Sequence, residues 1–493
     1  MQQKIVHPRR MLLKQGAGLL GLALAPIARA NTVPGNTPLA PGADRGGLVS
    51  NRPPVSQRTF TSSAVENSIE RVSNAIKNPE LRWLFENCYP NTLDTTVDFE
   101  WIDGKPDTFI ITGDIDAMWL RDSTAQVWPY MSLINEDEKI RNLIGGLVNR
   151  QVKCILRDPY ANAFYKDLSK ESQWASDEPT PIDGVHERKW EIDSLCYVIR
   201  LSDGYYRATG DTSIFDEHWQ QAMQEVLKVF RTEQRKQGES PYRFVRVSGR
   251  MIDAPVFEGT GRPVNPVGLI ASAFRPSDDA TVFPFLVPSN IFAMLSLRQL
   301  ASVYADVLEQ PEAAATCLDF ANELDQAIQA HCVAEHQGFG KIYAYEVDGF
   351  GNKLFMDDAN VPSLMSLAYL DPAFADDPIY QNTRRFLLSD SNPYFLRGTA
   401  AEGQGSPHTG KEKIWPMGII LRAMTASDEK EIIHCLRMLK NTHADTGFMH
   451  EAFHKDDPKD FNRAWFAWAN TLFGELLVNL QREKPEILAM RNI

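Results

Sequence analysis

The sequence predicts an all-α protein in which paired helices close into a toroid and long loops carry the chemistry. Apolar residues recur mainly with the 3.6-residue period of a helix, and stretches that alternate like a strand are few. Prolines, glycines and aromatic residues fill the segments between the helical stripes. There is no P-loop and no G-x-G-x-x-G between a strand and a helix, which argues against the common nucleotide-binding folds.

Roughly ten to twelve segments of about 12 to 20 residues show the helical repeat. Near residue 427 a serine precedes two acids, which is typical of a helix N-cap followed by an acidic first turn. Alternating patterns are confined to residues 242–247 and 341–347. The clearest helical stripes are Trp219, Met223, Val226, Leu227 and Phe230; Leu297, Leu300, Tyr304 and Val307; Phe320, Leu324, Ile328 and His331; and Ile432, Cys435 and Leu439.

The composition is that of a large acidic globular protein. Of the 493 residues, 43% are apolar and 10% aromatic, which excludes a disordered or collagen-like chain. Asp and Glu (64) outnumber Lys and Arg (51), for a net charge of −13, so a phosphate backbone is an unfavourable partner. We expect no nucleic-acid partner, no membrane insertion and a monomer.

Residues 1–30 have the order of an export signal. A basic region with the pair Arg9-Arg10 precedes a mildly apolar run, and the small residues Ala28 and Ala30 mark a cleavage site. The paired arginines favour the twin-arginine route, so we expect a periplasmic or otherwise exported protein. An amphipathic first helix is the alternative. Residues 31–60, rich in Pro and Gly, are expected to be a flexible tether, and residues 61–493 a single catalytic domain.

The cysteines contain no C-x-x-C pair, so zinc-finger and thioredoxin interpretations fail. Twin-arginine cargo typically crosses the membrane already folded, after folding in a reducing compartment. We therefore expect mostly buried free thiols at Cys88, Cys154, Cys196, Cys317, Cys332 and Cys435.

The densest polar and aromatic cluster spans residues 112–123. It combines the carboxylates Asp114, Asp116 and Asp122 with Trp119 and Arg121. Carboxylates accept hydrogen bonds from sugar hydroxyls and an indole stacks on a sugar ring, so this set is typical of a carbohydrate pocket. The alternative is a helix N-terminus with a capping aspartate and an ion-paired arginine.

A second cluster contains the adjacent acids Asp278 and Asp279 on an apolar-flanked loop. Neighbouring carboxylates repel one another, which tends to raise the pKa of one of them. A carboxyl group with a raised pKa is what a general acid working near neutrality needs. The alternative is an exposed loop in which both groups are hydrated.

Two weaker candidates lie elsewhere in the chain. Glu191 and Asp193, beside Trp190, form a pair of acids similar to Asp278 and Asp279. Glu402 precedes the loop 403–408, which ends at His408 and has the composition of a rigid segment presenting polar groups.

Residues 450–454 match the H-E-x-x-H pattern of zinc peptidases through His450, Glu451 and His454. Zinc binding needs both histidines on one continuous helix and a third ligand. Pro458 would end such a helix at once, although Glu475 is far enough downstream to serve as a ligand. The alternative is Glu451 as a loop carboxylate acting as a general base. The tryptophans of residues 462–470 fit a core, although Trp465 could reach a pocket.

Several of these segments in order resemble glycoside hydrolase family 125, the metal-independent exo-α-1,6-mannosidases. They are T-G-D-I-D-A-M-W-L-R-D-S, F-R-P-S-D-D-A, G-S-P-H, M-H-E-A-F-H-K-D-D and R-A-W-F-A-W-A-N, and the similarity runs from about residue 62 to about 485. The resemblance implies an (α/α)6 barrel and no metal or cofactor. It also implies removal of terminal non-reducing α-1,6-linked mannose from a mannose-containing oligosaccharide or glycan, with inversion at the anomeric carbon.

By the same resemblance, Asp278 is the general acid, with Asp279 as the fallback, and Glu451 is the general base. An inverting enzyme needs such a pair, about 6.5–9.5 Å apart, to protonate the leaving oxygen and to activate water. The residues expected to bind the sugar are Asp114, Asp116, Trp119, Arg121, Asp122, Asp279, Glu402, His408 and His450.

Three other functions remain open at the level of sequence. One is a zinc metallopeptidase that uses His450, Glu451 and His454. Another is a non-catalytic mannan-binding protein that uses the 112–123 cluster. The third is an (α/α)6 glycosidase with a different linkage preference.

Overall fold

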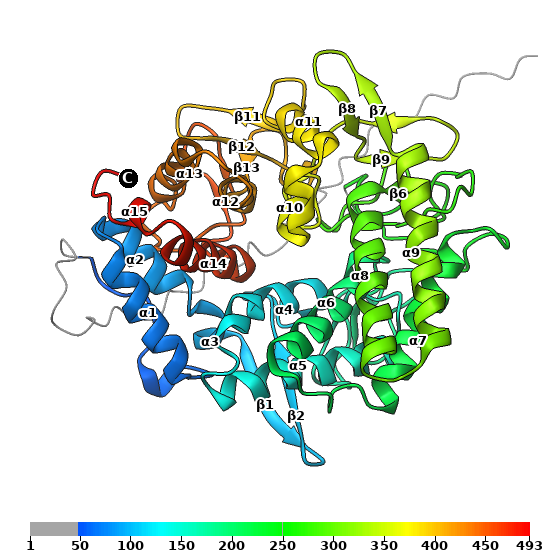
Figure 1. The fold of residues 1–493 in the computed structure, drawn as a ribbon, viewed down its shortest axis with the longest axis horizontal. Coiled ribbons are helices and arrows are strands. Elements are labelled where there is room, and N and C mark those ends of the chain that lie inside the picture. Colours follow the sequence, from blue (N-terminus) through cyan, green and yellow to red (C-terminus); the bar gives the residue numbers. More distant parts are fainter. Residues whose placement is uncertain (1–47, 249) are drawn as a thin grey trace, which may run out of the picture.

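The computed structural model describes residues 48–248 and 250–493, and this part of the chain is mostly helical (Figure 1). The signal predicted for residues 1–30 lies outside the described residues. The helices are α1 (Ser63–Ala75), α2 (Pro79–Cys88), α3 (Asn91–Thr95), α4 (Leu120–Val127), α5 (Glu138–Arg157), α6 (Ile192–Thr209), α7 (Glu217–Glu233), α8 (Val287–Asp306), α9 (Pro311–His331), α10 (Leu367–Leu370), α11 (Pro378–Leu387), α12 (Pro416–Met424), α13 (Glu429–Asn441), α14 (Ala467–Glu483) and α15 (Pro485–Leu488).

The strands are short and pair in small antiparallel sheets, in the orders β1-β2, β3-β4-β5, β10-β9-β6, β7-β8, β11-β12 and β13-β14-β15. They are β1 (Val97–Ile102), β2 (Lys105–Ile110), β3 (Met118–Trp119), β4 (Ala163–Phe164), β5 (Val185–Glu187), β6 (Phe285–Leu286), β7 (Val333–His336), β8 (Gly340–Tyr343), β9 (Glu346–Val347), β10 (Lys353–Leu354), β11 (Phe395–Arg397), β12 (Glu402–Gln404), β13 (Lys413–Ile414), β14 (Ala452–His454) and β15 (Phe461–Asn462).

The helical stripes predicted from the sequence are confirmed, and α7 is representative. The Asp216 side chain caps the helix by accepting a hydrogen bond from the Trp219 N–H. Met223, Val226 and Phe230 are fully buried on the same face. Burial of each such side chain stabilises the fold by roughly 1.5–3 kcal/mol, which exceeds any difference in helix propensity.

Two local predictions need correction. The N-cap of α13 is Asp428, one residue later than predicted, and its side chain accepts from the Lys430 N–H. Residues 242–247 do not form a strand: Val245 makes a single bridge to Glu178, and the buried Tyr242 is fixed by its hydroxyl. The second alternating segment does pair, within β8 and β9.

The chain returns on itself, so that its first and last helices pack together (Figure 1). Helix α14 contacts α1, α2, α3 and α4, and further contacts link α4 to α6, α6 to α8, and α12 to α14. The outer helix α9 packs along α8, and α13 packs along α12. This order is consistent with the paired helices that the sequence predicts.

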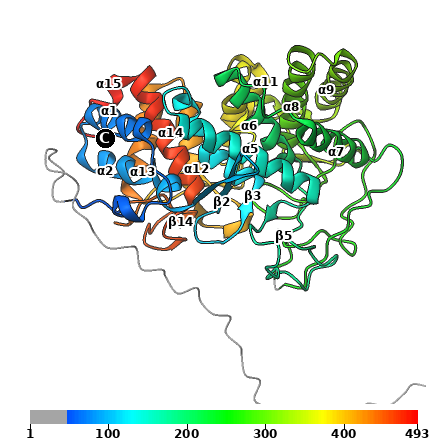
Figure 2. The same cartoon turned by 90° about the horizontal axis from the view of Figure 1, so that it is seen from below.

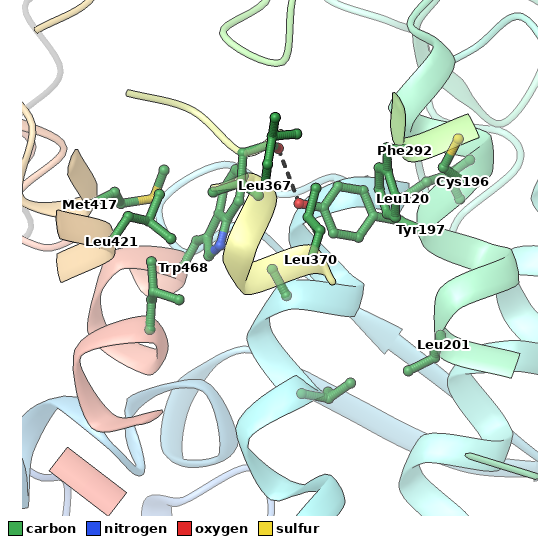
Figure 3. Packing of buried hydrophobic residues seen from close by; sticks show 14 of the residues in the cluster. Leu120, Cys196, Tyr197, Leu201, Phe292, Leu367, Leu370, Met417, Leu421 and Trp468 are labelled. Carbon is green, nitrogen blue, oxygen red and sulfur yellow. Dashed lines mark hydrogen bonds between the residues drawn. The ribbon is translucent and has the colours of Figure 1, made fainter. Parts of the chain in front are cut away.

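The hydrophobic core lies between α4, α6, α8, α10, α12 and α14, which we call the central helices. Figure 3 shows Leu120, Tyr197, Phe292 and Trp468 converging from four of these helices, with leucines of α10 between them. The Tyr197 hydroxyl donates to the carbonyl of Val361 at 3.0 Å, which ties α6 to the segment before α10. The core therefore fixes how the helix starts lie relative to one another.

Several of the short strands lie on one side of the helices. Figure 2 shows β3, β5 and β14 together at that edge, away from α9 and α15. Of the central helices, α4 begins directly after β3, and α12 begins two residues after β13. Loops and helix N-termini thus meet on the same side of the molecule.

The segment before α1 is more ordered than the predicted tether. From residue 48 onward the chain packs against the body: the Arg52 side chain is 6% exposed and bonds to Asp94 at 2.7 Å and to Glu66 at 3.0 Å. The Trp83 indole N–H donates to the carbonyl of Val49. The rest of the predicted tether, residues 31–47, lies outside the described residues.

All six cysteines are buried and free, as expected. Within the described residues, no helix is both long and apolar enough to cross a membrane.

Replacing Arg52 by Met should lower the free energy of unfolding by about 3 kcal/mol, because the carboxylate of Asp94, 3% exposed, loses its principal partner. Urea denaturation measures the change. Lys105→Met is the matched control: it breaks an ion pair to Asp216 in which the lysine is 58% exposed, and should cost under about 1 kcal/mol. Equal effects of the two substitutions would contradict the structural role of residues 48–60.

Candidate active site

A small pocket of about 50 Å³ opens where α4, α12 and α14 begin. Of the residues predicted to form the site, six line this pocket: Trp119, Arg121, Asp122, Asp278, His408 and Glu451. The other lining residues are Thr112, Ile115, Pro276, Ser277, Asn360, Trp415, Arg463, Phe466 and Trp468. Carboxylates, indoles and guanidinium groups therefore surround one narrow space.

The sheet β3-β4-β5 positions one wall of the pocket. Trp119 pairs with Ala163, which in turn pairs with Glu187, so segments distant in sequence lie side by side. The Leu120 N–H donates to the carbonyl of Asn162 and extends this pairing into the first turn of α4. Arg121 consequently projects from the helix start toward the residues that follow β5.

The guanidinium of Arg121 is the centre of a buried charge cluster. Its side chain is 3% exposed and has a carboxylate oxygen of Glu191 at 2.5 Å, of Asp193 at 3.3 Å, of Asp278 at 3.4 Å and of Asp122 at 3.5 Å. Three of these four carboxylates, Asp122, Glu191 and Asp193, are buried, and the single charge of Arg121 cannot balance all of them. Some of these carboxyl groups must hold a proton at neutral pH.

Burial and position decide where the protons reside. Burial raises the pKa of Asp122 and of Asp193 to about 6, against the opposing charge of Arg121. Burial also raises the pKa of Glu191 strongly, and its hydrogen bond to Asp278 and the negative charges of Asp278 and Asp193 add to this. Glu191 is therefore the carboxyl group that holds its proton most firmly.

The pKa of Asp278 is not raised, although the sequence led us to expect this of the general acid. Burial acts to raise its pKa, but Arg121, Lys189 and the hydrogen bond from Glu191 outweigh it and lower the pKa below the usual range. Asp279 does have a raised pKa, because burial outweighs its bond to His408. The groups that chiefly lower the pKa of Asp278 are thus Arg121 and Lys189, and the adjacent acid does not raise it.

The backbone at Asp278 is held in an uncommon conformation. Its φ is 65°, in the left-handed region that a non-glycine residue rarely adopts. Lys189, 4% exposed, donates to its carbonyl at 2.8 Å, and the Asn162 amide donates to its carboxylate at 3.2 Å. These bonds hold the side chain at the pocket, where it is 25% exposed.

The opposite half of the site is built by the sheet β13-β14-β15. Glu451 directly precedes β14 and Arg463 directly follows β15, so the antiparallel pairing brings them together. Arg463 lies 3.5 Å from the Glu451 carboxylate, donates to the Thr112 carbonyl at 3.0 Å and ion-pairs with Asp114. Glu451 is 14% exposed and remains open to the pocket.

His408 bridges the two halves. Its Nδ1 lies 2.9 Å from the Asp279 carboxylate. Burial acts to lower the pKa of His408, but the hydrogen bond and charge of Asp279, together with Glu451 and Asp278, raise it above 6.5. The imidazole therefore favours its positive form between the two acidic loops.

Four buried polar atoms of the pocket residues have no hydrogen-bond partner within the described structure: Thr112 Oγ1, Trp119 Nε1, Arg121 Nε and Arg463 Nε. Unpaired buried donors are costly and are commonly satisfied by a ligand or water. Indole and guanidinium donors can bind only acceptors, and sugar hydroxyls supply them.

The H-E-x-x-H segment does not have the geometry of a zinc site. His454 lies on strand β14, so the two histidines are not one helical turn apart. His450 stacks on Phe461 with ring centroids 4.0 Å apart, whereas His454 is paired with Glu412. Among the described residues, no three His, Cys, Asp or Glu side chains are grouped to hold a metal ion.

Five predicted site residues lie outside the pocket lining. Asp116 is 78% exposed and paired with Lys170, and Asp114 reaches the site only through Arg463. Glu402 lies apart, between two arginines. Asp279 and His450 lie behind the lining, in contact with His408 and with the carbonyl of Arg463 respectively.

Sequence reasoning missed several residues of the site. Arg463 and Trp468 belong to the segment 462–470, of which only the tryptophans were considered, and Trp465 packs on Gly113 instead of lining the pocket. No local sequence pattern identifies Asn162 and Lys189. Both act through hydrogen bonds to Asp278, which lies 116 and 89 residues away in the sequence.

A much larger hollow, of about 1090 Å³, lies toward the C-terminal ends of the central helices. Its arginines are engaged with their own partners, as in the pairs Arg207–Asp203 and Arg298–Asp325. Its residue Glu475 has a pKa raised to about 7 by burial and is hydrogen-bonded to Tyr369. Size favours this hollow, but the facing carboxylates and unpaired donors favour the small pocket as the active site.

A narrow pocket with carboxylates on two sides and indoles between them, set on the loops of a helical framework, is that of a glycoside hydrolase. Comparison with known families agrees: residues 78–478 match the metal-independent α-mannosidases, GH125. The chain belongs to this family and is an α-mannosidase-family glycoside hydrolase.

Two relatives illustrate the similarity. A solved structure from Streptococcus pneumoniae, a metal-independent α-mannosidase in a non-productive complex with α-1,6-mannobiose, is 40% identical and superposes with a TM-score of 0.83. The match covers 86% of this chain and 100% of that one. The Meiotically up-regulated gene 157 protein of Schizosaccharomyces pombe is 42% identical over 460 residues, 89% of each chain.

The protonation of His408 gives a direct test of the site's electrostatics. Its pKa should lie above 6.5, and Asp279→Asn should lower it by removing the carboxylate that stabilises the imidazolium. Histidine side-chain NMR titration measures this. His450 is an internal control, since burial lowers its pKa to about 4, and the substitution should leave it unchanged. An unchanged His408 titration in Asp279→Asn would refute the assigned contact.

Proposed function

We propose that this protein is an exo-acting α-1,6-mannosidase that hydrolyses terminal non-reducing mannose with inversion. The observation that carries the proposal is the pair Asp278 and Glu451, two carboxylates from separate loops that face one small pocket. The small size of this pocket favours binding of the end of a sugar chain over its middle. Family membership supports the mannose specificity, and the α-1,6-mannobiose bound by the relative supports the linkage.

The proposed reaction is a single displacement. Asp278 protonates the glycosidic oxygen as the bond from the anomeric carbon breaks, and Glu451 removes a proton from the water that attacks the opposite face. Asp122 and Arg121 bind the hydroxyls of the sugar, and Trp119 stacks on its ring. His408 adds positive charge as negative charge develops on the leaving oxygen.

Two further proposals concern the framework and the compartment. The contacts that link α4 to α6, α6 to α8, α12 to α14 and α14 to α4 support an (α/α)6 barrel, and α10, which lies between α8 and α12 in Figure 1, would close it. The paired arginines of residues 9–10 support export by the twin-arginine route, with mannose-containing glycans outside the cytoplasm as the substrate.

The protein should release mannose from α-1,6-mannobiose, but not from its α-1,2 and α-1,3 isomers, and EDTA should not reduce the rate. NMR of the first-formed sugar should show β-mannose, because a single displacement inverts the anomeric carbon. Release from another isomer would assign a different linkage, and an initial α-anomer would contradict the inverting mechanism.

Asp278→Asn and Glu451→Gln should each lower kcat by about 10²- to 10⁴-fold while leaving the fold intact, because each removes one proton transfer. Steady-state kinetics and circular dichroism measure the two effects. Glu402→Gln is the matched control, since Glu402 lies outside the pocket among arginines, and its kcat should change less than about tenfold. A variant at 278 or 451 retaining a tenth of the activity would remove that residue from the mechanism.

A further inference from the structure

The buried side chain of Asp358 connects the loop of Asp278 to the loop of His408. Its Oδ2 atom accepts a hydrogen bond from the hydroxyl of Ser277 at 2.9 Å and another from the hydroxyl of Ser406 at 2.9 Å. Ser277 directly precedes Asp278, and Ser406 lies two residues before His408. One oxygen atom therefore contacts two segments of the site that are distant in the sequence.

The other carboxylate oxygen of Asp358 holds a third part of the pocket. Oδ1 accepts from the backbone N–H of Asn360 at 3.2 Å and from its side-chain amide at 3.0 Å. Asn360 and Ser277 line the pocket, whereas Asp358 is fully buried behind the lining. Asp358 can therefore act on a bound sugar only through these neighbours.

The segment that carries Asp358 is anchored to the hydrophobic core. The Asp357 side chain accepts from the two backbone N–H groups of residues 364–365, at 2.9 and 3.0 Å, which closes the turn before α10. The hydroxyl of Tyr197 on α6 donates to the carbonyl of Val361 at 3.0 Å. The central helices thus fix the position of Asp358, and Asp358 fixes the two loops relative to those helices.

The backbone of Asp278 needs support from its neighbours, because its φ of 65° lies in the left-handed region. A non-glycine residue stays in that region only when the surrounding contacts hold it there. On the C-terminal side, Asp279 is bonded to His408 at 2.9 Å. On the N-terminal side, the bond from Ser277 to Asp358 supplies the corresponding contact.

The chemistry of a carboxylate suits this connecting role. The four groups that donate to Asp358 are uncharged, and burial of a carboxylate among uncharged groups costs free energy. A carboxylate is, however, an acceptor with about four lone-pair sites, so it can hold four donors at once. The arrangement therefore favours precise placement of the loops over stability.

We propose that Asp358 is a positioning residue that fixes the general acid Asp278 relative to His408. This inference rests on the proposed function. Protonation of the leaving oxygen requires the carboxyl group of Asp278 within hydrogen-bond reach of that oxygen. A displacement of about 1 Å can lower the rate about 10²-fold, so the bond between Asp358 and the preceding residue, Ser277, bears directly on acid catalysis.

The test compares two mannosides whose leaving groups differ in their need for a proton. The sugar alkoxide of α-1,6-mannobiose must be protonated as it leaves, whereas the fluoride of α-mannosyl fluoride leaves readily without protonation. Both reactions still need Glu451 to activate water. We expect Asp358→Ala to lower kcat/KM for mannobiose by about 10²-fold and kcat/KM for the fluoride much less. Ser277→Ala removes one of the four bonds and should shift the ratio of the two values in the same direction by a smaller factor.

Asp348→Ala is the matched control. The Asp348 carboxylate is also buried and accepts from the N–H of Phe350 and from the N–H and side-chain amide of Asn352, none of which lines the pocket. Its ratio of the two kcat/KM values should remain that of the wild type. Asp278→Asn calibrates the comparison, because loss of the acid itself should depress hydrolysis of mannobiose far more than hydrolysis of the fluoride.

Circular dichroism establishes whether each variant is folded, and Ser277→Ala decides the question if Asp358→Ala does not fold. An equal loss on both substrates would overturn the inference, because a merely structural role affects both reactions alike. The same shift of the ratio in Asp348→Ala would also overturn it. If the wild type releases no mannose from mannobiose, or if Asp278→Asn loses both activities equally, the proposed function fails instead.

Discussion

The buried guanidinium of Arg121 is the constraint on which the site depends. It lies in the first turn of α4 and joins the start of α6, through Glu191 and Asp193, to the loop that carries Asp278. Without it these acids would lie in the interior without compensation, at a cost of several kcal/mol. The ion pairs of Arg121 offset the cost of burying these acids. They also align two helices and the strained loop that carries Asp278.

Competing electrostatic effects have different sizes in this cluster. Asp122 and Asp193 lie in the first turns of α4 and α6, where the helix dipole favours a negative charge by roughly 0.3–2 kcal/mol. Their pKa values are nevertheless raised to about 6, so loss of solvent outweighs both the dipole and Arg121. Burial is therefore the largest influence on the pKa of these two carboxyl groups.

The sequence was sufficient for features that depend on nearby residues. The stripes of α7 and α9 could be read directly, and Asp278 and Glu451 were found as acids in unusual loops. Contacts between segments distant in the chain could not be predicted, because Glu191 and Arg121 are separated by 70 positions in the sequence and meet only in the folded protein. One local pattern was misleading: the alternation at 242–247 reflects side chains buried for packing. The H-E-x-x-H match was already doubtful from Pro458, and the structure places His454 on a strand.

Local sequence also fails to predict two other features: the packed segment that begins at residue 48 and the role of Arg463. A Pro/Gly-rich composition indicated a tether, yet Arg52 meets Asp94 in a buried ion pair that composition cannot reveal. Nothing in the sequence distinguishes Arg463 from the other arginines. It reaches Glu451 because β14 and β15 pair in the folded protein. Both residues act through partners that only the tertiary structure supplies.

The position of the aromatic pocket residues has a consequence for divergence within the family. Trp119, Trp415 and Phe466 each occupy the position just before a central helix, and Leu120, Met417 and Trp468, one or two residues further on, pack in the shared core. Each of these three aromatic residues therefore belongs to its own short segment. Such segments can change in length or composition one at a time, so new glycan preferences can arise while the helices beneath stay as they are.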